Sequence, residues 1–187
     1  MLFRSLDGEA TVEKYSYDAT AGDLSAKLSF YNGSLPVKIG FAETVDIKRT
    51  PVNAKTMWAA APGSADESCA WEIKLNTTGY KNLVFSAKQK STGSAPAYWG
   101  LAYRVGTTGS FTPIANSEVK IIGVSNDYYS ALKYSYRAFE LPAALNNKNE
   151  VYIRVYMTKN LDASDRELVA SGGNTSINSI EVRGDNL

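Results

Sequence analysis

Apolar and polar residues alternate with a period of two along several segments of the chain. The pattern is clearest in residues 83–88 (LVFSAK), 98–104 (YWGLAYR) and 151–158 (VYIRVYMT). A period of two places successive side chains on opposite faces of a β-strand, so one face of each strand is expected to pack on a core. Turn signals at 77–80 (TTGY), 92–94 (TGS) and 106–109 (GTTG) interrupt the apolar runs of residues 71–111. The pattern therefore predicts short strands joined by tight turns.

Other segments of strand length follow the same pattern. They cover residues 11–17, 24–31, 37–47, 119–124, 132–141 and 176–184. Asn32-Gly33 is a strong hairpin signal. Residues 164–170 are the one short helix candidate, with acidic residues in the first turn. Many short strands at near-regular spacing predict an all-β fold, a two-sheet antiparallel β-sandwich of the jelly-roll type.

The 187 residues suit one β-sandwich domain. Residues 38–187 are expected to form its core. Residues 1–37 supply either the first strands of the sandwich or an added hairpin, and no linker-like tract separates them from the rest.

Composition excludes several classes of function. The chain has no His and a single Cys69, which removes His-based catalysis, His-ligated zinc and an internal disulfide. Cys69 is expected to be a small, partly buried side chain. A net charge of +1, with basic residues spread along the chain, gives no reason to expect a nucleic acid partner. No apolar run approaches membrane-spanning length, so no membrane insertion is expected.

Three blocks of sequence resemble a known family. They are residues 77–114 (TTGYKNLVFSAKQKSTGSAPAYWGLAYRVGTTGSFTPI), 139–155 (FELPAALNNKNEVYIRV) and 172–184 (GGNTSINSIEVRG). They are similar to the jelly-roll β-sandwich modules with a galactose-binding-like fold that occur in large secreted or surface-attached bacterial proteins. The resemblance implies an extracellular module with neighbouring domains. It is specific for the fold and weak for function, because such modules serve as carbohydrate-binding modules, spacers and adhesive domains.

The resemblance also bears on metal binding. The family often has an Asp that helps to hold a structural calcium ion where this chain has Asn178. A calcium site here would use Glu43, Asp46, Asn178 and backbone carbonyl oxygens. No other cofactor is expected.

The strand phases suggest a ligand-binding face. In residues 151–158 the aliphatic phase is expected to face the core, which leaves the Tyr and Arg residues on the other face. If residues 98–104 and 132–141 share that sheet, one outer face collects up to five tyrosines, two arginines and a floor of Gly100 and Ala102. Aromatic rings stack on sugars while Arg and Tyr hydroxyl groups bind their hydroxyls. The candidates on this face are Tyr98, Arg104, Tyr134, Tyr136, Tyr152, Arg154 and Tyr156. Trp58, followed by the small residues 59–61 beside a loop, is either a further platform at the loop tips or a core residue.

Two hypotheses about function follow. The first is a non-catalytic carbohydrate-binding module that binds polysaccharide through this aromatic sheet face. The alternative is a structural or adhesive spacer without a glycan ligand, in which the same tyrosines are covered by other parts of the chain or by a partner. An enzyme is not expected, because glycosidase chemistry needs two facing carboxylates and no spacing marks such a pair.

Overall fold

The computed structural model describes residues 14–19, 21–41, 52–54, 56, 58, 61, 64–121, 133–168 and 172–187, with backbone alone at 41, 52–54 and 133. Almost all of the regular structure in these residues is β. The elements in chain order are β1 (Ser16–Asp18), β2 (Lys27–Asn32), β3 (Leu35–Val37), β4 (Gly40–Phe41), β5 (Val52–Ala54), β6 (Cys69–Leu75), β7 (Tyr80–Ser91), β8 (Tyr98–Val105), β9 (Thr112–Pro113), β10 (Val119–Lys120), β11 (Lys133–Glu140), the 3-10 helix η1 (Ala143–Leu145), β12 (Val151–Met157) and β13 (Thr175–Asn186).

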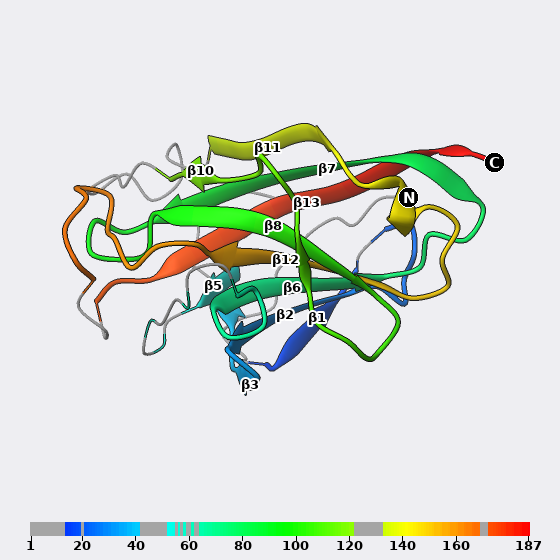
Figure 1. The fold of residues 1–187 in the computed structure, drawn as a ribbon. Coiled ribbons are helices and arrows are strands. Elements are labelled where there is room, and N and C mark those ends of the chain that lie inside the picture. The colour runs from blue at the N-terminus through cyan, green and yellow to red at the C-terminus, as the bar shows by residue number, and fades with distance from the viewer. Residues whose placement is uncertain are drawn as a thin grey trace.

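The strands form two antiparallel sheets. The eight-stranded sheet has the order β1-β2-β6-β12-β8-β10, with β3 beside β2 and β9 beside β8; the five-stranded sheet has the order β11-β7-β13-β5-β4. Figure 1 shows the two sheets as layers, one with β7, β11 and β13 and the other with β8, β12, β6 and β2. The predicted fold class, an all-β two-sheet antiparallel sandwich, is confirmed. The galactose-binding-like relationship stays a prediction.

The core lies between the sheets. Trp71 of β6, Trp99 of β8 and Phe85 of β7 are fully buried in one apolar cluster. The aliphatic phase of β12 faces this cluster, as its alternation predicted. Cys69 is also buried there.

The amino-terminal strands belong to the eight-stranded sheet, because β2 pairs with β6 along its whole length, from Lys27↔Lys74 to Asn32↔Cys69. Gly33 follows at the β2–β3 turn with φ of +60°, a left-handed conformation that favours glycine.

The predicted helix at 164–170 is wrong for its described residues. Residues 161–168 instead form a turn closed by a bridge between Leu161 and Glu167. The Asp162 carboxylate accepts hydrogen bonds from the backbone N–H groups of Ser164 and Arg166. A side chain that bonds to nearby backbone in this way favours a turn over a helix.

The expectation that residues 132–141 share a sheet with β8 and β12 is wrong. β11 pairs with β7 in the five-stranded sheet, and a register shift lies between Tyr134 and Tyr136. The shift turns these two tyrosines to opposite sides, although their spacing of two predicts one side. Tyr136 was therefore wrongly assigned to an outer face: it is 2% exposed in the core.

The hydroxyl of Tyr136 connects the two sheets. It donates toward the carbonyl oxygens of Ser117, at 3.0 Å, and of Trp99 in β8, at 3.2 Å. Burial raises the pKa of Tyr136 well above its ordinary value, so the phenol is a hydrogen-bond donor at neutral pH.

Tyr136→Phe is expected to lower the free energy of unfolding by about 1–2 kcal/mol, because two buried carbonyl groups lose their donor. Urea denaturation measures this loss. Tyr134→Phe is the matched control, since Tyr134 of the same strand is exposed, and should change stability by less than about 0.5 kcal/mol. Equal effects of the two substitutions would contradict the connecting role of Tyr136.

Candidate functional site

The predicted outer phase of β8 and β12 is confirmed by their register. Tyr152 lies opposite Arg104, Arg154 opposite Ala102, and Tyr156 opposite Gly100. The aliphatic partners of these residues face the core. The sequence therefore identified correctly which side chains of the two strands share the outer face.

This face is covered by other parts of the chain. Ala65 and Phe111, from two separate loops, form a second apolar cluster with Ala70, Ala102 and the rings of Tyr152 and Tyr156. We call residues 64–68 together with Phe111 the roof. Beneath it Tyr152, Arg154 and Tyr156 are 9%, 6% and 6% exposed. The rings of Tyr152 and Tyr156 therefore offer no open surface on which a sugar ring could stack.

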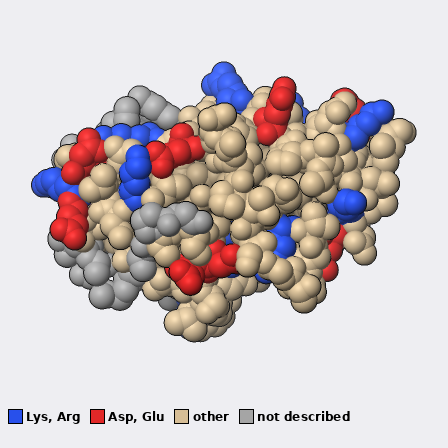
Figure 2. Space-filling view, viewed as in Figure 1, with Lys and Arg blue, Asp and Glu red and all other residues tan. Residues whose placement is uncertain are grey.

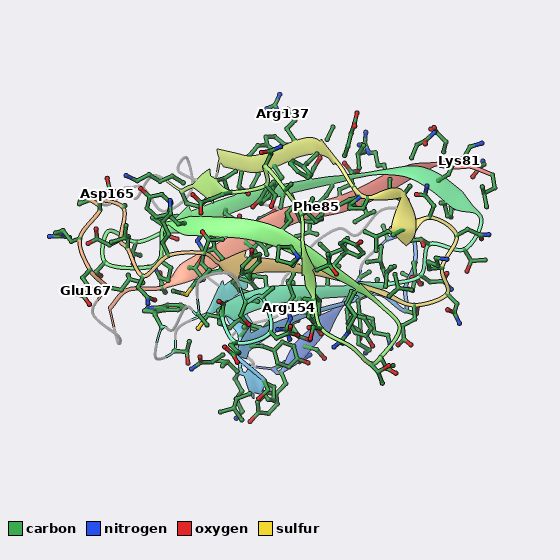
Figure 3. The ribbon with its side chains drawn as sticks, in the orientation of Figure 1. Lys81, Phe85, Arg137, Arg154, Asp165 and Glu167 are labelled. Atoms are coloured by element: carbon green, nitrogen blue, oxygen red, sulfur yellow. The ribbon has the colours of Figure 1, made fainter. Side chains whose placement is uncertain are left out.

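Arg154 fixes the roof to the sheet. Its Nε donates to Glu72 of β6 at 2.8 Å, and its Nη1 donates to the carbonyl oxygen of Ala65 at 2.9 Å. Its guanidinium lies 4.2 Å from the centre of the Phe111 ring. The Phe111 N–H in turn donates to the Asp66 carboxylate. Figure 3 shows Arg154 over the central strands of the eight-stranded sheet. Arg154 acts as a structural anchor in this arrangement.

The predicted floor of small residues is filled by the protein itself. A Cβ atom on Gly100 would lie 2.9 Å from Thr158 Cγ2 and 3.3 Å from Tyr156 Cε1. Arg104 is placed between two rings, with its guanidinium 4.6 Å from the centres of both Tyr152 and Phe111. Gly100 therefore makes room for a tyrosine of the same sheet and not for a ligand.

Tyr98 lies at one end of the same face, within a charged cluster. Its hydroxyl donates to Asp165, and Lys120 and Lys159 lie over its ring, 5.4 and 4.3 Å from the centre. Asp165 pairs with Lys120, and Glu118 with Lys159. Hydrogen bonds from Lys120 and Tyr98 hold the pKa of Asp165 below its ordinary value. Every charge of this cluster has an opposite partner.

Trp58 is not an exposed platform. It is buried in the core cluster, packs edge-to-face on Phe30, and donates its indole N–H to the Gly172 carbonyl oxygen. Tyr134, by contrast, is exposed, and it lies on the five-stranded sheet, away from the candidates of β8 and β12.

The predicted calcium site stays a prediction. Glu43 and Asp46 lie outside the described residues, and Asn178 of β13 is buried, its side-chain oxygen accepting a hydrogen bond from Ser179. Within the described residues, no group of three or more His, Cys, Asp or Glu side chains is arranged to hold a metal ion.

A cavity of about 390 Å³ opens at the loop end of the sandwich, and we call it the loop-end pocket. Gly22, Asp23, Asn76, Thr78 and Tyr80 line it. Gly22 and Asp23 precede β2, Asn76 and Thr78 belong to the turn between β6 and β7, and Tyr80 is the first residue of β7. Because β2 pairs with β6, these two turns meet at one end of the eight-stranded sheet.

Hydrogen bonds hold the polar groups of the loop-end pocket in place. Asp23 accepts from the N–H and hydroxyl of Ser25 and from the backbone N–H of Asn76 at 3.0 Å. The Asn76 side-chain oxygen accepts from the Thr78 N–H. Burial raises the pKa of Asp23, but these hydrogen bonds outweigh it and hold the pKa below the ordinary 3.8. The pocket therefore presents a carboxylate, an amide, a hydroxyl and an aromatic ring.

Sequence reasoning missed this pocket. Asp23 followed two residues later by Ser25 is a turn signal, and residues 77–80 were read as a turn. Neither signal says that the two turns are neighbours, because that depends on the pairing of β2 with β6.

Within the described residues, no helix is both long enough and apolar enough to cross a membrane. Figure 2 shows Lys and Arg interspersed with Asp and Glu over the visible face, without a stripe of one sign.

Comparisons with known proteins give fold likenesses at low similarity. No family model matches the chain, and no curated protein matches it. The chain is similar to the K1 cleaved adhesin domain of Lys-gingipain from Porphyromonas gingivalis W83, with 10% identity, a TM-score of 0.42, and 86% of this chain and 84% of that chain covered.

It is also similar to two carbohydrate-binding modules. One is CBM28, specific for non-crystalline cellulose, with 9% identity, a TM-score of 0.44, and 96% and 97% of the two chains covered. The other is CtCBM11, with 13% identity, a TM-score of 0.35, and 95% and 98% covered. At this level of similarity, function has to be argued from the residues of this chain.

Glu72→Ala should cost about 3–5 kcal/mol in the free energy of unfolding, because it leaves the buried guanidinium of Arg154 without its counter-charge. The double substitution Glu72→Leu/Arg154→Met should cost clearly less than Glu72→Ala. Lys159→Ala, which breaks an exposed ion pair with Glu118, is the control and should cost at most about 1 kcal/mol. Urea denaturation compares the three variants, and a Glu72→Ala loss no larger than the control would disprove the anchoring role.

Asp23→Asn should lose stability at neutral pH and not in acid. The folded-state pKa of Asp23 is lowered, so its ionised form contributes stability above the unfolded pKa near 3.8, and this contribution disappears as the pH falls through the folded pKa. Denaturation of wild type and variant between about pH 7 and about pH 2 measures the difference. A difference that stays constant or grows toward low pH would contradict this assignment.

Proposed function

We propose that this chain is a non-catalytic carbohydrate-binding module that binds a sugar residue in the loop-end pocket. The observation that carries the proposal is the pocket itself: a cavity of about 390 Å³ that combines hydrogen-bonding side chains with one aromatic wall. Small-molecule sites have volumes of roughly 300–1,000 Å³ and few, well-placed polar groups.

The chemistry of the pocket suits a pyranose. The Asp23 carboxylate is ionised and retains acceptor capacity beside its three hydrogen bonds, so it can accept from sugar hydroxyls. The Asn76 amide and Thr78 hydroxyl are exposed and supply donors, and the Tyr80 ring offers a surface for the C–H face of a sugar. Prior fixation of these groups by hydrogen bonds lowers the entropic cost of binding.

The same geometry argues against catalysis in this pocket. Asp23 is the one carboxylate among the described residues that line it, whereas glycoside hydrolysis uses a pair. Its lowered pKa also disfavours service as a general acid at neutral pH.

The parent protein is proposed to be secreted or attached to a cell surface, with further domains beside this module. This part of the proposal rests on the resemblance of residues 77–114, 139–155 and 172–184 to modules of such proteins.

A structural or adhesive spacer is the second candidate function. The roof favours it, because Tyr152, Arg154 and Tyr156 stabilise the sheet against its own loops where a ligand face was predicted. The two candidates differ in one measurable property, which is glycan binding by the loop-end pocket.

Thr78→Trp should abolish glycan binding, because the indole would fill the pocket from an exposed turn position with little effect on folding. The matched control is Thr108→Trp, which adds the same side chain to an exposed turn elsewhere. Affinity electrophoresis against a panel of plant and microbial polysaccharides detects binding, and thermal melting confirms folding.

Retention of wild type and Thr108→Trp with loss of retention in Thr78→Trp supports the proposal. Binding that survives in Thr78→Trp would place the glycan elsewhere, and absence of binding by the wild type to the whole panel would favour the spacer.

A further inference from the structure

Two cations share one exposed tyrosine ring on the outer face of the five-stranded sheet. Tyr134 of β11 lies opposite Lys88 of β7 in the register of the two strands. The Lys88 Nζ lies 4.8 Å, and the Arg137 guanidinium carbon 4.5 Å, from the centre of the Tyr134 ring. Tyr134 is 44% exposed, and Figure 3 shows Arg137 projecting outward from β11. We call Lys88, Tyr134 and Arg137 the cationic triad.

An irregular backbone creates the triad. Register shifts flank Tyr136, and Ala138 has a φ of +48°, a left-handed conformation that is costly for alanine. Ala138 is held in it by a hydrogen bond from its N–H to the Ser86 hydroxyl. The shifts turn Tyr136 inward while Tyr134 and Arg137 remain on the outside. Both cations thereby reach the same ring.

The cations of the triad have no carboxylate partner in the described part of the chain. Neither Lys88 nor Arg137 takes part in the ion pairs found there, whereas Arg183 on the same sheet pairs with Glu181. The ring contacts orient the two cations but do not neutralise them, because an aromatic face carries only a quadrupole.

The cluster around Tyr98 is a comparable arrangement in which the cations are neutralised by carboxylates. There, too, two cations lie over one tyrosine ring, but Lys120 pairs with Asp165 and Lys159 with Glu118. The two cations over the Tyr98 ring thus have carboxylate partners, whereas the two over the Tyr134 ring take part in none of the described ion pairs.

We propose that the cationic triad binds the anionic group of an acidic polysaccharide, either the carboxylate of a uronic acid or a sulfate ester. Arg137 would hold two oxygens of the anion through its planar guanidinium, and Lys88 would act as a point charge. The Tyr134 hydroxyl would add a further donor. This site shares no residue with the loop-end pocket and does not depend on it.

The surroundings favour a glycan over a nucleic acid. Nucleic acid binding relies on many cations that follow a phosphate backbone, whereas the whole chain has a net charge of +1. A pair of cations beside one tyrosine fits isolated anionic groups carried on a hydroxyl-rich polymer.

The test compares polymers that differ in charge alone. Polygalacturonate is paired with its methyl-esterified form, and dextran sulfate with dextran. Wild-type protein should bind the acidic member of at least one pair and not the neutral one, with an affinity that falls as salt is added. Preference for polygalacturonate assigns the carboxylate, and preference for dextran sulfate assigns the sulfate.

Lys88→Gln/Arg137→Gln should weaken this binding by about tenfold, because two exposed charge contacts are lost. Lys120→Gln/Lys159→Gln is the matched control: it removes the same net charge at the Tyr98 cluster, and its binding should be unchanged. Isothermal titration calorimetry gives the affinities, and circular dichroism melting confirms that both variants fold.

Any of the following results would overturn the proposal: equal binding of acidic and neutral polymers, undiminished binding by Lys88→Gln/Arg137→Gln, or an equal loss in the control. Equally tight binding of a single-stranded RNA would also overturn it, since that indicates general anion adsorption. None of these results bears on the Thr78→Trp experiment. Disproof of anion binding by the cationic triad would therefore not disprove sugar binding in the loop-end pocket.

Discussion

The buried guanidinium group of Arg154 determines how the outer face of the eight-stranded sheet is covered. Arg154 belongs to β12, between β6 and β8, where its side chain cannot reach solvent along the sheet. A buried charge of this kind is tolerated only with a counter-charge and further hydrogen bonds. Glu72 supplies the first and the Ala65 carbonyl the second, and Phe111 closes over the pair. The eight-stranded sheet consequently packs against apolar groups on both faces, against the core on one and against the roof on the other.

This double burial determines where a ligand can bind. The roof takes up the side chains that would otherwise make an aromatic binding face, so the accessible chemistry lies at the ends and on the opposite sheet. At the loop end, two turns place Asp23 and Tyr80 in one cavity. On the five-stranded sheet, Tyr134 stays exposed, with two cations near its ring. Such a division is common in β-sandwiches, where the sheets supply rigidity and the loops or one outer face supply recognition.

The sequence predicts the local structure of each strand better than it predicts which strands lie beside it. Alternation in β8 and β12 is regular, so the inward and outward residues of both strands follow directly from a period of two. The same rule failed at Tyr134 and Tyr136, because a register shift between them is not encoded in any spacing of apolar residues. The roof and the loop-end pocket depend on contacts between segments far apart in the chain, such as Ala65 with Arg154, and periodicity carries no information about these. Trp58 shows a further limit: its small apolar neighbours suggested a loop tip, yet the tertiary contact with Phe30 places it in the core.

The irregular backbone of β11 has a consequence for assembly. Among the described strands, β11 ends the order of the five-stranded sheet, so one side of it has no neighbour in that order. A flat, regular strand in such a position offers a row of unpaired backbone donors and acceptors with which an extended segment of another chain can pair. The two register shifts and the left-handed Ala138 interrupt that row, and Arg137 adds a charge to it. The distortion that gathers the cations around Tyr134 therefore also discourages uncontrolled edge-to-edge association, which would matter wherever many copies of such a module are crowded together.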